Sequence, residues 1–207
     1  PHLETIKRDV LSNIDALFGE MSQQQRDKVV GIGIAIPDDL SAWEATVGAP
    51  AGEMADWADA DLANDVSEAF GLPVKSLNDA SAACLAEIAL GNSARHACFA
   101  YFYIGTFIGG GVAIGGQLFN GQHNLAGAIA SLPIAATSSG VAPQLLEGAS
   151  LHYLEQAANA AGLNEESFYH DDDIDAPFTA IFHEWLETAA PQIAFAAMSV
   201  QAFLDPD

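Results

Sequence analysis

The chain has 207 residues, half of them apolar, and carries 28 acidic against six basic side chains, a formal net charge of −22 at pH 7. Its apolar runs are short, and none reaches the roughly 18–20 residues needed to cross a bilayer, so we expect no membrane partner. Arg95 is the last Lys or Arg. Because nucleic-acid binding draws most of its affinity from such side chains, residues 96–207 are unsuited to binding DNA.

The first residues and the two cysteines indicate a cytoplasmic protein. Near the start of the chain, apolar residues alternate with Glu4, Lys7 and Arg8, which is unlike the apolar core of a secretory signal peptide. Cys84 and Cys98 are far apart and form no C-x-x-C pair. We therefore predict neither a disulfide nor a zinc site from them.

Helices and strands are predicted to alternate along the first 91 residues. Apolar residues at helical spacing predict a helix over 3–21, and the nearly continuous run 29–36, ended by Pro37, predicts a strand buried on both faces of a sheet. The pattern then predicts a helix over 59–70, a strand over 72–76 and a helix over 79–90 closed by Gly91. This order favours a mainly parallel α/β sheet with right-handed crossovers.

The second half is predicted to begin with antiparallel strands and to end in helices. Strands over 97–104 and 111–114 are joined through a glycine-rich turn, and Gly115-Gly116 turns the chain into a further strand at 117–119. Long helices are predicted over 143–161 and 177–203, separated by an acidic loop at 171–175.

The pair Asn78-Asp79 lies where a predicted strand meets a predicted helix. A carboxylate at a helix start is stabilised by the helix dipole and by free N–H groups, which keeps it ionised and able to accept a proton from a hydroxyl group. The alternative is a plain N-cap, and on the residues alone capping is the more common role of such an Asp.

Residues 105–111 read Gly-Thr-Phe-Ile-Gly-Gly-Gly. Glycines allow consecutive N–H groups to point at a phosphate, and the threonine hydroxyl adds a donor, so Gly105, Thr106, Gly109 and Gly110 are the candidate phosphate-binding residues. A glycine-rich hairpin turn without a ligand is the alternative.

Together with the flanking segments 29–37 and 71–76, these two motifs resemble the ROK family of bacterial sugar kinases and sugar-responsive repressors. The resemblance implies an α/β actin-like (ribonuclease H-like) ATPase fold. It divides the chain into the remainder of an N-terminal lobe, 1–76, and an incomplete C-terminal lobe, 77–207. We expect a segment truncated at both ends, because the family's Asp-x-Gly-Gly-Thr hairpin and its final strand are not found.

The resemblance also implies roles for individual residues. Asn78 and Asp79 match the family's sugar-binding pair, in which the Asp is the general base of the kinases. Glu147 is the candidate for a later sugar-binding Glu, with a solvent-exposed residue at a helix start as the alternative. Family members usually have glycine at the position of Phe107, whose ring is expected to cap or partly fill the phosphate pocket.

Other positions depart from the kinase pattern. Ala128 replaces a Glu, Ala130-Ser131 replace a Gly-His pair, and the stretch 137–144 has no thiol where the kinases have a cysteine-rich zinc loop. Zinc prefers Cys and His ligands, so we expect no zinc. The loss of the Glu and the His also removes two groups that would orient a sugar.

We therefore predict the sugar-binding effector domain of a ROK-type transcriptional regulator, with a small-molecule sugar as partner. DNA would be bound only through a helix-turn-helix outside this segment, and we expect a homodimer or higher oligomer. The alternative is an ATP- and magnesium-dependent sugar kinase with Asp79 as general base, in which case ATP and magnesium are the cofactors. A third possibility is an oligomerising relic that binds nothing.

Overall fold

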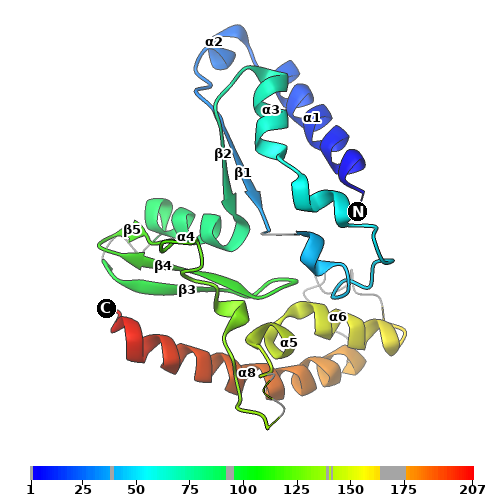
Figure 1. The fold of residues 1–207 in the computed structure, drawn as a ribbon, viewed down its shortest axis with the longest axis vertical. Helices are drawn as coiled ribbons and strands as arrows, with labels where there is room; N and C mark the ends of the chain where they lie inside the picture. The colour runs from blue at the N-terminus through cyan, green and yellow to red at the C-terminus, as the bar shows by residue number, and fades with distance from the viewer. Residues whose placement is uncertain (1, 38–39, 92–95, 139, 141, 164–175) are drawn as a thin grey trace. The chain divides into compact units, whose positions relative to one another are not determined.

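The computed structural model describes the chain except residues 1, 38–39, 92–95, 139, 141 and 164–175. The acidic stretch 171–175, predicted as a loop, lies outside the described residues. The chain forms two compact units, Pro1–Asp79 (unit 1) and Ala80–Asp207 (unit 2), whose elements are labelled in Figure 1.

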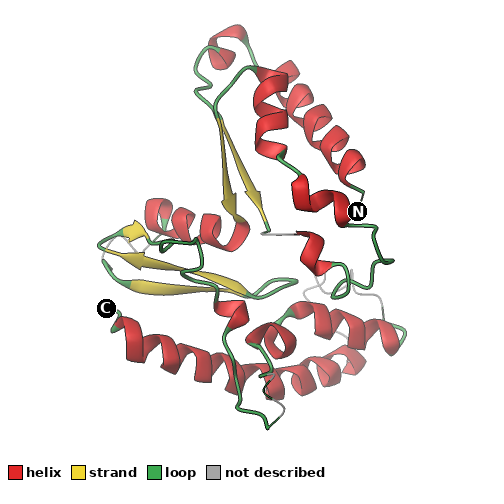
Figure 2. Ribbon diagram, viewed as in Figure 1, coloured by secondary structure: helices red, strands yellow, loops and turns green. Residues whose placement is uncertain are grey.

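The described part of unit 1 combines helices with a pair of parallel strands (Figure 2). Its elements are α1 (Leu3–Glu20), α2 (Gln23–Arg26), β1 (Ile32–Ile36), η1 (Leu40–Trp43), η2 (Ala55–Asp59), α3 (Leu62–Phe70) and β2 (Val74–Asn78). The two strands pair in parallel, as predicted, with Ile32 opposite Val74 and Ile36 opposite Asn78. The crossover between them contains α3, which packs beside β2.

Helix α1 joins unit 1 through its contacts with α3. The rings of Phe18 and Phe70 stack with their centroids 5.6 Å apart, and Lys7 Nζ lies 2.8 Å from Asp65 Oδ2. The predicted helix over 3–21 is confirmed, because α1 covers almost the same residues.

Two predictions for unit 1 need correction. Strand β1 begins at Ile32, and it is not buried on both faces, because Gly33 and Ala35 are exposed while the isoleucines between them are half-buried. Within β1, side-chain size therefore alternates and only the isoleucines are covered, while Val30, before the strand, is 88% exposed. Helix α3 begins at Leu62 because the Asp61 side chain caps it, accepting a hydrogen bond from Asn64 N at 2.9 Å.

Unit 2 combines an antiparallel sheet with helices. Its elements are α4 (Asp79–Leu90), which starts with the last residue of unit 1, β3 (Phe99–Tyr103), β4 (Gly109–Ile114), β5 (Gln117–Leu118), η4 (Ile129–Ser131), α5 (Leu145–Ala149), α6 (Leu151–Ala160) and α8 (Ala176–Leu204). The strand order is β3-β4-β5, antiparallel as predicted. Gly115 and Gly116, with φ of 63° and 73°, form the turn between β4 and β5.

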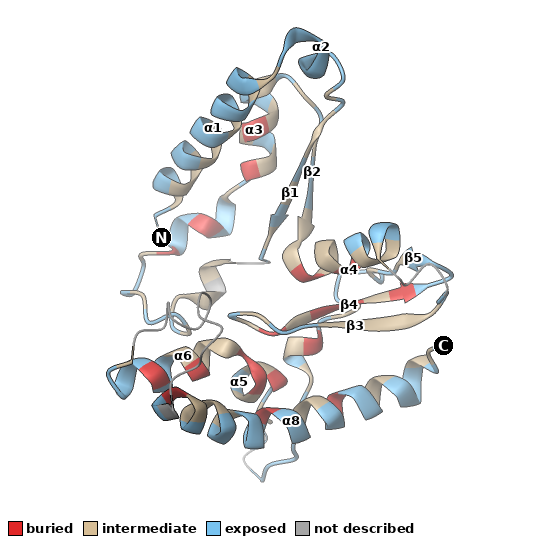
Figure 3. Cartoon of the chain, turned by 180° about the vertical axis from the view of Figure 1, so that it is seen from behind, coloured by how far each residue is buried: buried red, intermediate tan, exposed pale blue. Residues whose placement is uncertain are grey.

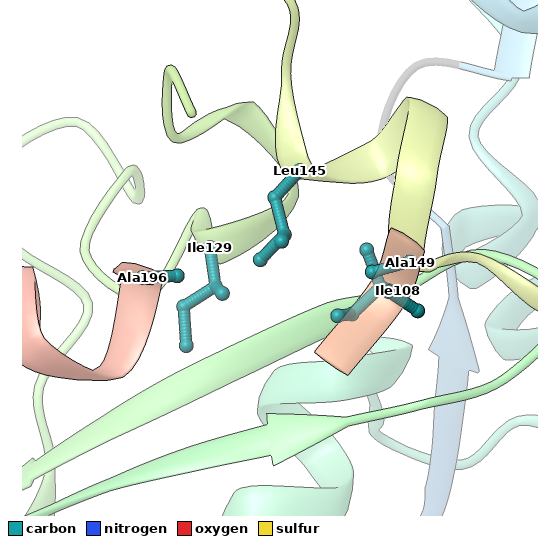
Figure 4. Packing of buried hydrophobic residues seen from close by; sticks show 6 residues of the cluster. Ile108, Ile129, Leu145, Ala149 and Ala196 are labelled. Carbon is teal, nitrogen blue, oxygen red and sulfur yellow. The ribbon is translucent and has the colours of Figure 1, made fainter. Parts of the chain in front are cut away.

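The core of unit 2 lies where α5 and α6 pack against α8, and Figure 3 shows the buried residues of these helices. One buried cluster, drawn in Figure 4, consists of Ile108, Ile129, Leu145, Ala149, Ala189 and Ala196. A second consists of Leu154, Ala158 and Phe178. Trp185 of α8 packs against both clusters and so connects them.

The helix predicted over 143–161 is wrong in one respect: it is two helices, α5 and α6, divided at Ser150. This residue is extended, with φ of −80° and ψ of 143°, and serves as N-cap of α6. Helix α8 matches the prediction for 177–203 and contains Pro191. Within the described part of the chain, no helix is both long and apolar enough to cross a membrane.

Candidate functional site

The Asn78-Asp79 pair forms the junction of β2 and α4. Asn78 is the last residue of the strand and Asp79 the first residue of the helix, and both are half-buried. The structure thus places the pair at a strand-to-helix junction, as the sequence predicted. Their contact with a sugar stays a prediction.

Close packing accounts for the glycines at the start of β4. A β-carbon at Gly109 would lie 2.7 Å from the β-carbon of Ala80, and one at Gly111 would lie 2.5 Å from the β-carbon of Cys84. At Gly110 it would collide with the side chain of Ile129. Because Ala80 and Cys84 belong to α4, these glycines allow the helix to lie directly against the strand.

The same glycines are part of the sheet rather than of a turn. Gly109 pairs with Tyr103 and Gly110 with Phe102 in the antiparallel register. The turn predicted over 105–111 is therefore shorter, and the connecting loop consists of residues 104–108. Phosphate binding by Gly109 and Gly110 stays a prediction, but the structure gives both residues a packing role that needs no ligand.

The loop carrying Gly105 and Thr106 is held by the start of α6. Leu151 N donates to the Gly105 carbonyl at 3.0 Å, and His152 N donates to the Thr106 carbonyl at 2.9 Å. Ser150 Oγ accepts a hydrogen bond from Ile108 N at 3.0 Å. Thr106 itself is exposed and Ile108 is buried, so the loop presents the threonine while its other end is fixed in the core.

The ring of Phe107 lies against α6. Its centroid is 5.0 Å from that of His152, with the ring planes tilted by 37°, and Phe107 is half-buried. The structure thus gives this ring an aromatic neighbour on α6, and the expectation that it caps or partly fills a phosphate pocket stays a prediction.

Glu147 belongs to the short helix α5, and its side chain is exposed. Its neighbours fix the orientation of the helix: Leu145 and Ala149 are fully buried in the core, and Gly148 packs against the side chain of Gln192 on α8. Sugar binding by Glu147 stays a prediction, and so does the alternative of a solvent-exposed helix-start residue.

The stretch 127–131 is fixed by packing against β4. Gly127, with φ of 86°, lies so close to the strand that a β-carbon there would be 2.7 Å from Gly111 Cα. Ile129 is buried beside Gly110, whereas Ala128 and Ser131 are exposed. The places where the kinase pattern has Glu and His are therefore held firmly, but carry no carboxylate and no imidazole. Among the described residues, no group of three or more His, Cys, Asp or Glu side chains could hold a metal ion.

Unit 1 contains a hollow at the carboxyl ends of its parallel strands. Its volume is about 210 Å³, and its walls include Ile36 at the end of β1, Ser76 of β2 and Trp57. Trp57 is only 7% exposed, so it pins the loop before α3 to the rest of unit 1. The carboxyl ends of parallel strands are the usual place for ligands in α/β folds.

Sequence reasoning missed Glu44, which shapes the loop leading to this hollow. Its carboxylate accepts hydrogen bonds from Gly52 N at 2.8 Å and from Met54 N at 3.0 Å. These backbone donors, Met54 first, lower the pKa of Glu44 below its ordinary value. The sequence gives no signal for this role, because a single Glu eight residues before a glycine matches no motif.

The profile of the ROK family matches residues 3–141 of the chain. The chain belongs to the ROK family. Its relatives in this family include a repressor and an enzyme: it is 29% identical to the "Xylose repressor" of Bacillus subtilis over 64% of this chain and 35% of the repressor. It is 32% identical to the "Bifunctional enzyme NanE/NanK" of Brucella melitensis over 70% of this chain and 27% of the enzyme.

The chain thus spans about a third or less of the length of these two ROK relatives. The solved structure of a ROK family protein from Streptococcus pneumoniae, in complex with sucrose, matches 99% of this chain and 66% of the other, with a TM-score of 0.63 and 21% identity. This likeness extends over both units, and the predicted actin-like ATPase fold is confirmed.

Proposed function

We propose that these residues form the sugar-binding effector part of a ROK transcriptional regulator. The observation that carries the proposal is the stretch 127–131, which is packed tightly against β4 and yet presents Ala128 and Ser131 where the kinase pattern has Glu and His. Phosphoryl transfer depends mostly on positioning and electrostatic stabilisation. Recognition of a sugar tolerates the loss of two orienting groups better than transfer does.

The proposed sugar contacts are Asn78, Asp79 and Glu147, and no ATP, magnesium or zinc is required. The similarity to a xylose repressor supports a regulatory role. Because residues 96–207 lack Lys and Arg, DNA would be bound by a helix-turn-helix outside the 207 residues. Bound sugar would then act by favouring one arrangement of a homodimer or higher oligomer.

A sugar kinase is the second candidate, and the position of Asp79 as first residue of α4 is what favours it. A carboxylate at a helix start suits a general base for a sugar hydroxyl. The similarity to the bifunctional enzyme of Brucella melitensis supports an enzymatic role. In this reading Gly105, Thr106, Gly109 and Gly110 would bind the phosphates of ATP, with magnesium as the metal.

The deciding experiment uses the full polypeptide with Mg-ATP and a panel of pentoses, including xylose, hexoses and N-acetylated sugars. Sugar binding is measured by calorimetry and phosphoryl transfer by sugar-dependent ADP release. Asp79→Asn is compared with Glu4→Gln, a matched variant that alters an exposed carboxylate in the first turn of another helix, α1. The proposal expects that the wild type binds a sugar, that Asp79→Asn weakens this binding, that Glu4→Gln leaves it unchanged, and that no ADP is released. ADP release lost only in Asp79→Asn would establish the kinase, and no binding of any sugar would refute both readings.

A further inference from the structure

Ser150 is a fully buried polar residue at the meeting point of three parts of unit 2. Its hydroxyl accepts the hydrogen bond from Ile108 N, at the end of the loop between β3 and β4. Its carbonyl accepts a hydrogen bond from Trp185 Nε1 of α8 at 3.2 Å. The residue itself forms the break between α5 and α6. One side chain and one carbonyl thus join the loop, the helix pair and α8.

The loop also uses the donors at the start of α6. The first N–H groups of a helix have no partner within the helix and often bind anions. Here Leu151 N and His152 N donate to the carbonyl oxygens of Gly105 and Thr106. These two N–H groups of α6 are therefore engaged in orienting the loop.

We infer that Ser150 is a positioning residue: it holds the loop 105–108 in one conformation and thereby sets the direction in which Thr106 meets a ligand. The loop-holding part stands on the hydrogen bonds alone. The ligand part rests on the proposed function and adds Thr106 to the sugar contacts proposed there, because it requires that the chain bind its sugar near Thr106. Nothing in the sequence motif of the loop points to Ser150, which follows Ile108 by 42 residues.

The hydroxyl matters because Ile108 is only 2% exposed. A buried N–H that loses its acceptor has no water to replace it, and such a loss is costly. Without Oγ, the Ile108 N–H either stays unpaired in the core, or Ile108 moves outward until water reaches this N–H. In both cases Thr106 is held less firmly.

The first arm of the test measures amide hydrogen exchange in Ser150→Ala, with Ser199→Ala as the matched control. Ser199 lies on α8 and donates its hydroxyl hydrogen to the Phe195 carbonyl at the surface. We expect exchange at Ile108 and its loop neighbours to rise about tenfold or more in Ser150→Ala, to stay near the wild-type rate in Ser199→Ala, and to be restored largely in Ser150→Thr, which keeps the hydroxyl. Unchanged exchange in Ser150→Ala would overturn the inference.

The second arm measures the affinity for the best-binding sugar of the panel by calorimetry in Ser150→Ala, Thr106→Val and the double variant. If Ser150 acts by placing Thr106, each single change weakens binding by about five- to fiftyfold and the double change adds little to either. Fully additive effects, or an unchanged affinity in Ser150→Ala, would overturn the ligand part. If the wild type binds no sugar, the proposed function fails and the ligand part fails with it, while the exchange experiment still decides the loop-holding part.

Discussion

Replacing Gly111 by alanine tests the close packing of α4 on β4. The added β-carbon would lie 2.5 Å from the β-carbon of Cys84 and 2.8 Å from its sulfur, whereas carbon atoms in contact prefer about 3.5–4.0 Å. The nearest atom is attached to the helix backbone, and Cys84 is fully buried. The helix must therefore move by about 1 Å, since no side-chain rotation relieves the contact.

Overpacking of this kind lowers the free energy of unfolding by roughly 1–3 kcal/mol. We expect the upper half of that range, because the obstructing β-carbon of Cys84 is attached to the helix backbone. A loss of about 2 kcal/mol lowers Tm by roughly 5–10 °C in a unit of this size. Circular dichroism during heating and urea titration measures both quantities. Gly33→Ala is the control, because nothing lies within 4 Å of its added β-carbon; it should be neutral or stabilising by up to about 1 kcal/mol.

A second-site change separates this mechanism from a general sensitivity of β4. Cys84→Ala removes the sulfur but keeps the β-carbon, so it should rescue Gly111→Ala poorly. Cys84→Gly removes both atoms, so the double variant should lose less stability than the sum of its single changes. A Gly111→Ala protein as stable as the wild type, or a double variant that is fully additive, would refute the packing argument.

Two further predictions concern charge. Glu44 has a lowered pKa, so its stabilising contribution is fully present above the unfolded pKa of about 4.3 and is lost as the pH falls through the lower folded value. Glu44→Gln should therefore lower Tm at pH 7, and the difference in Tm between the variant and the wild type should shrink below about pH 4. A difference in Tm that does not depend on pH would contradict the assigned role. With only six basic against 28 acidic side chains, most of the negative charge has no Lys or Arg to pair with, and the net charge is −22. Shortening the Debye length from about 10 Å at 0.1 M salt to about 3 Å at 1 M should therefore raise Tm. A Tm that stays constant or falls over that series would show that self-repulsion does not limit stability.

Local patterns in the sequence predicted most elements because the physical rules behind them are local. The helical spacing of apolar residues located α1 and α8, and the glycine pair at 115–116 located the hairpin turn. The predicted strand-to-helix junction at Asn78-Asp79 also agrees with the junction of β2 and α4. These features depend on residues a few positions apart, which a single sequence contains.

The errors arose where a distant residue decides the local conformation. The pattern over 143–161 is helical throughout, but Ser150 is extended, and its hydroxyl accepts a hydrogen bond from Ile108 N, 42 residues earlier in the chain. Similarly, the glycines after Ile108 were predicted as part of a turn, but they belong to strand β4. Gly109 and Gly111 lie against Ala80 and Cys84 of α4, where a β-carbon would not fit.

By itself the sequence determined the family, the α/β alternation, the carboxylate at the start of α4 and the loss of Glu and His from the kinase pattern, because these are properties of residue type and spacing. Only the tertiary structure decided that Thr106 is presented by a loop held from α6, that the ring of Phe107 lies against that of His152, and that Ala128 lies in a stretch packed against β4. The reason is that burial and hydrogen-bond partners are set by contacts between segments, and the chain order does not reveal which segments meet.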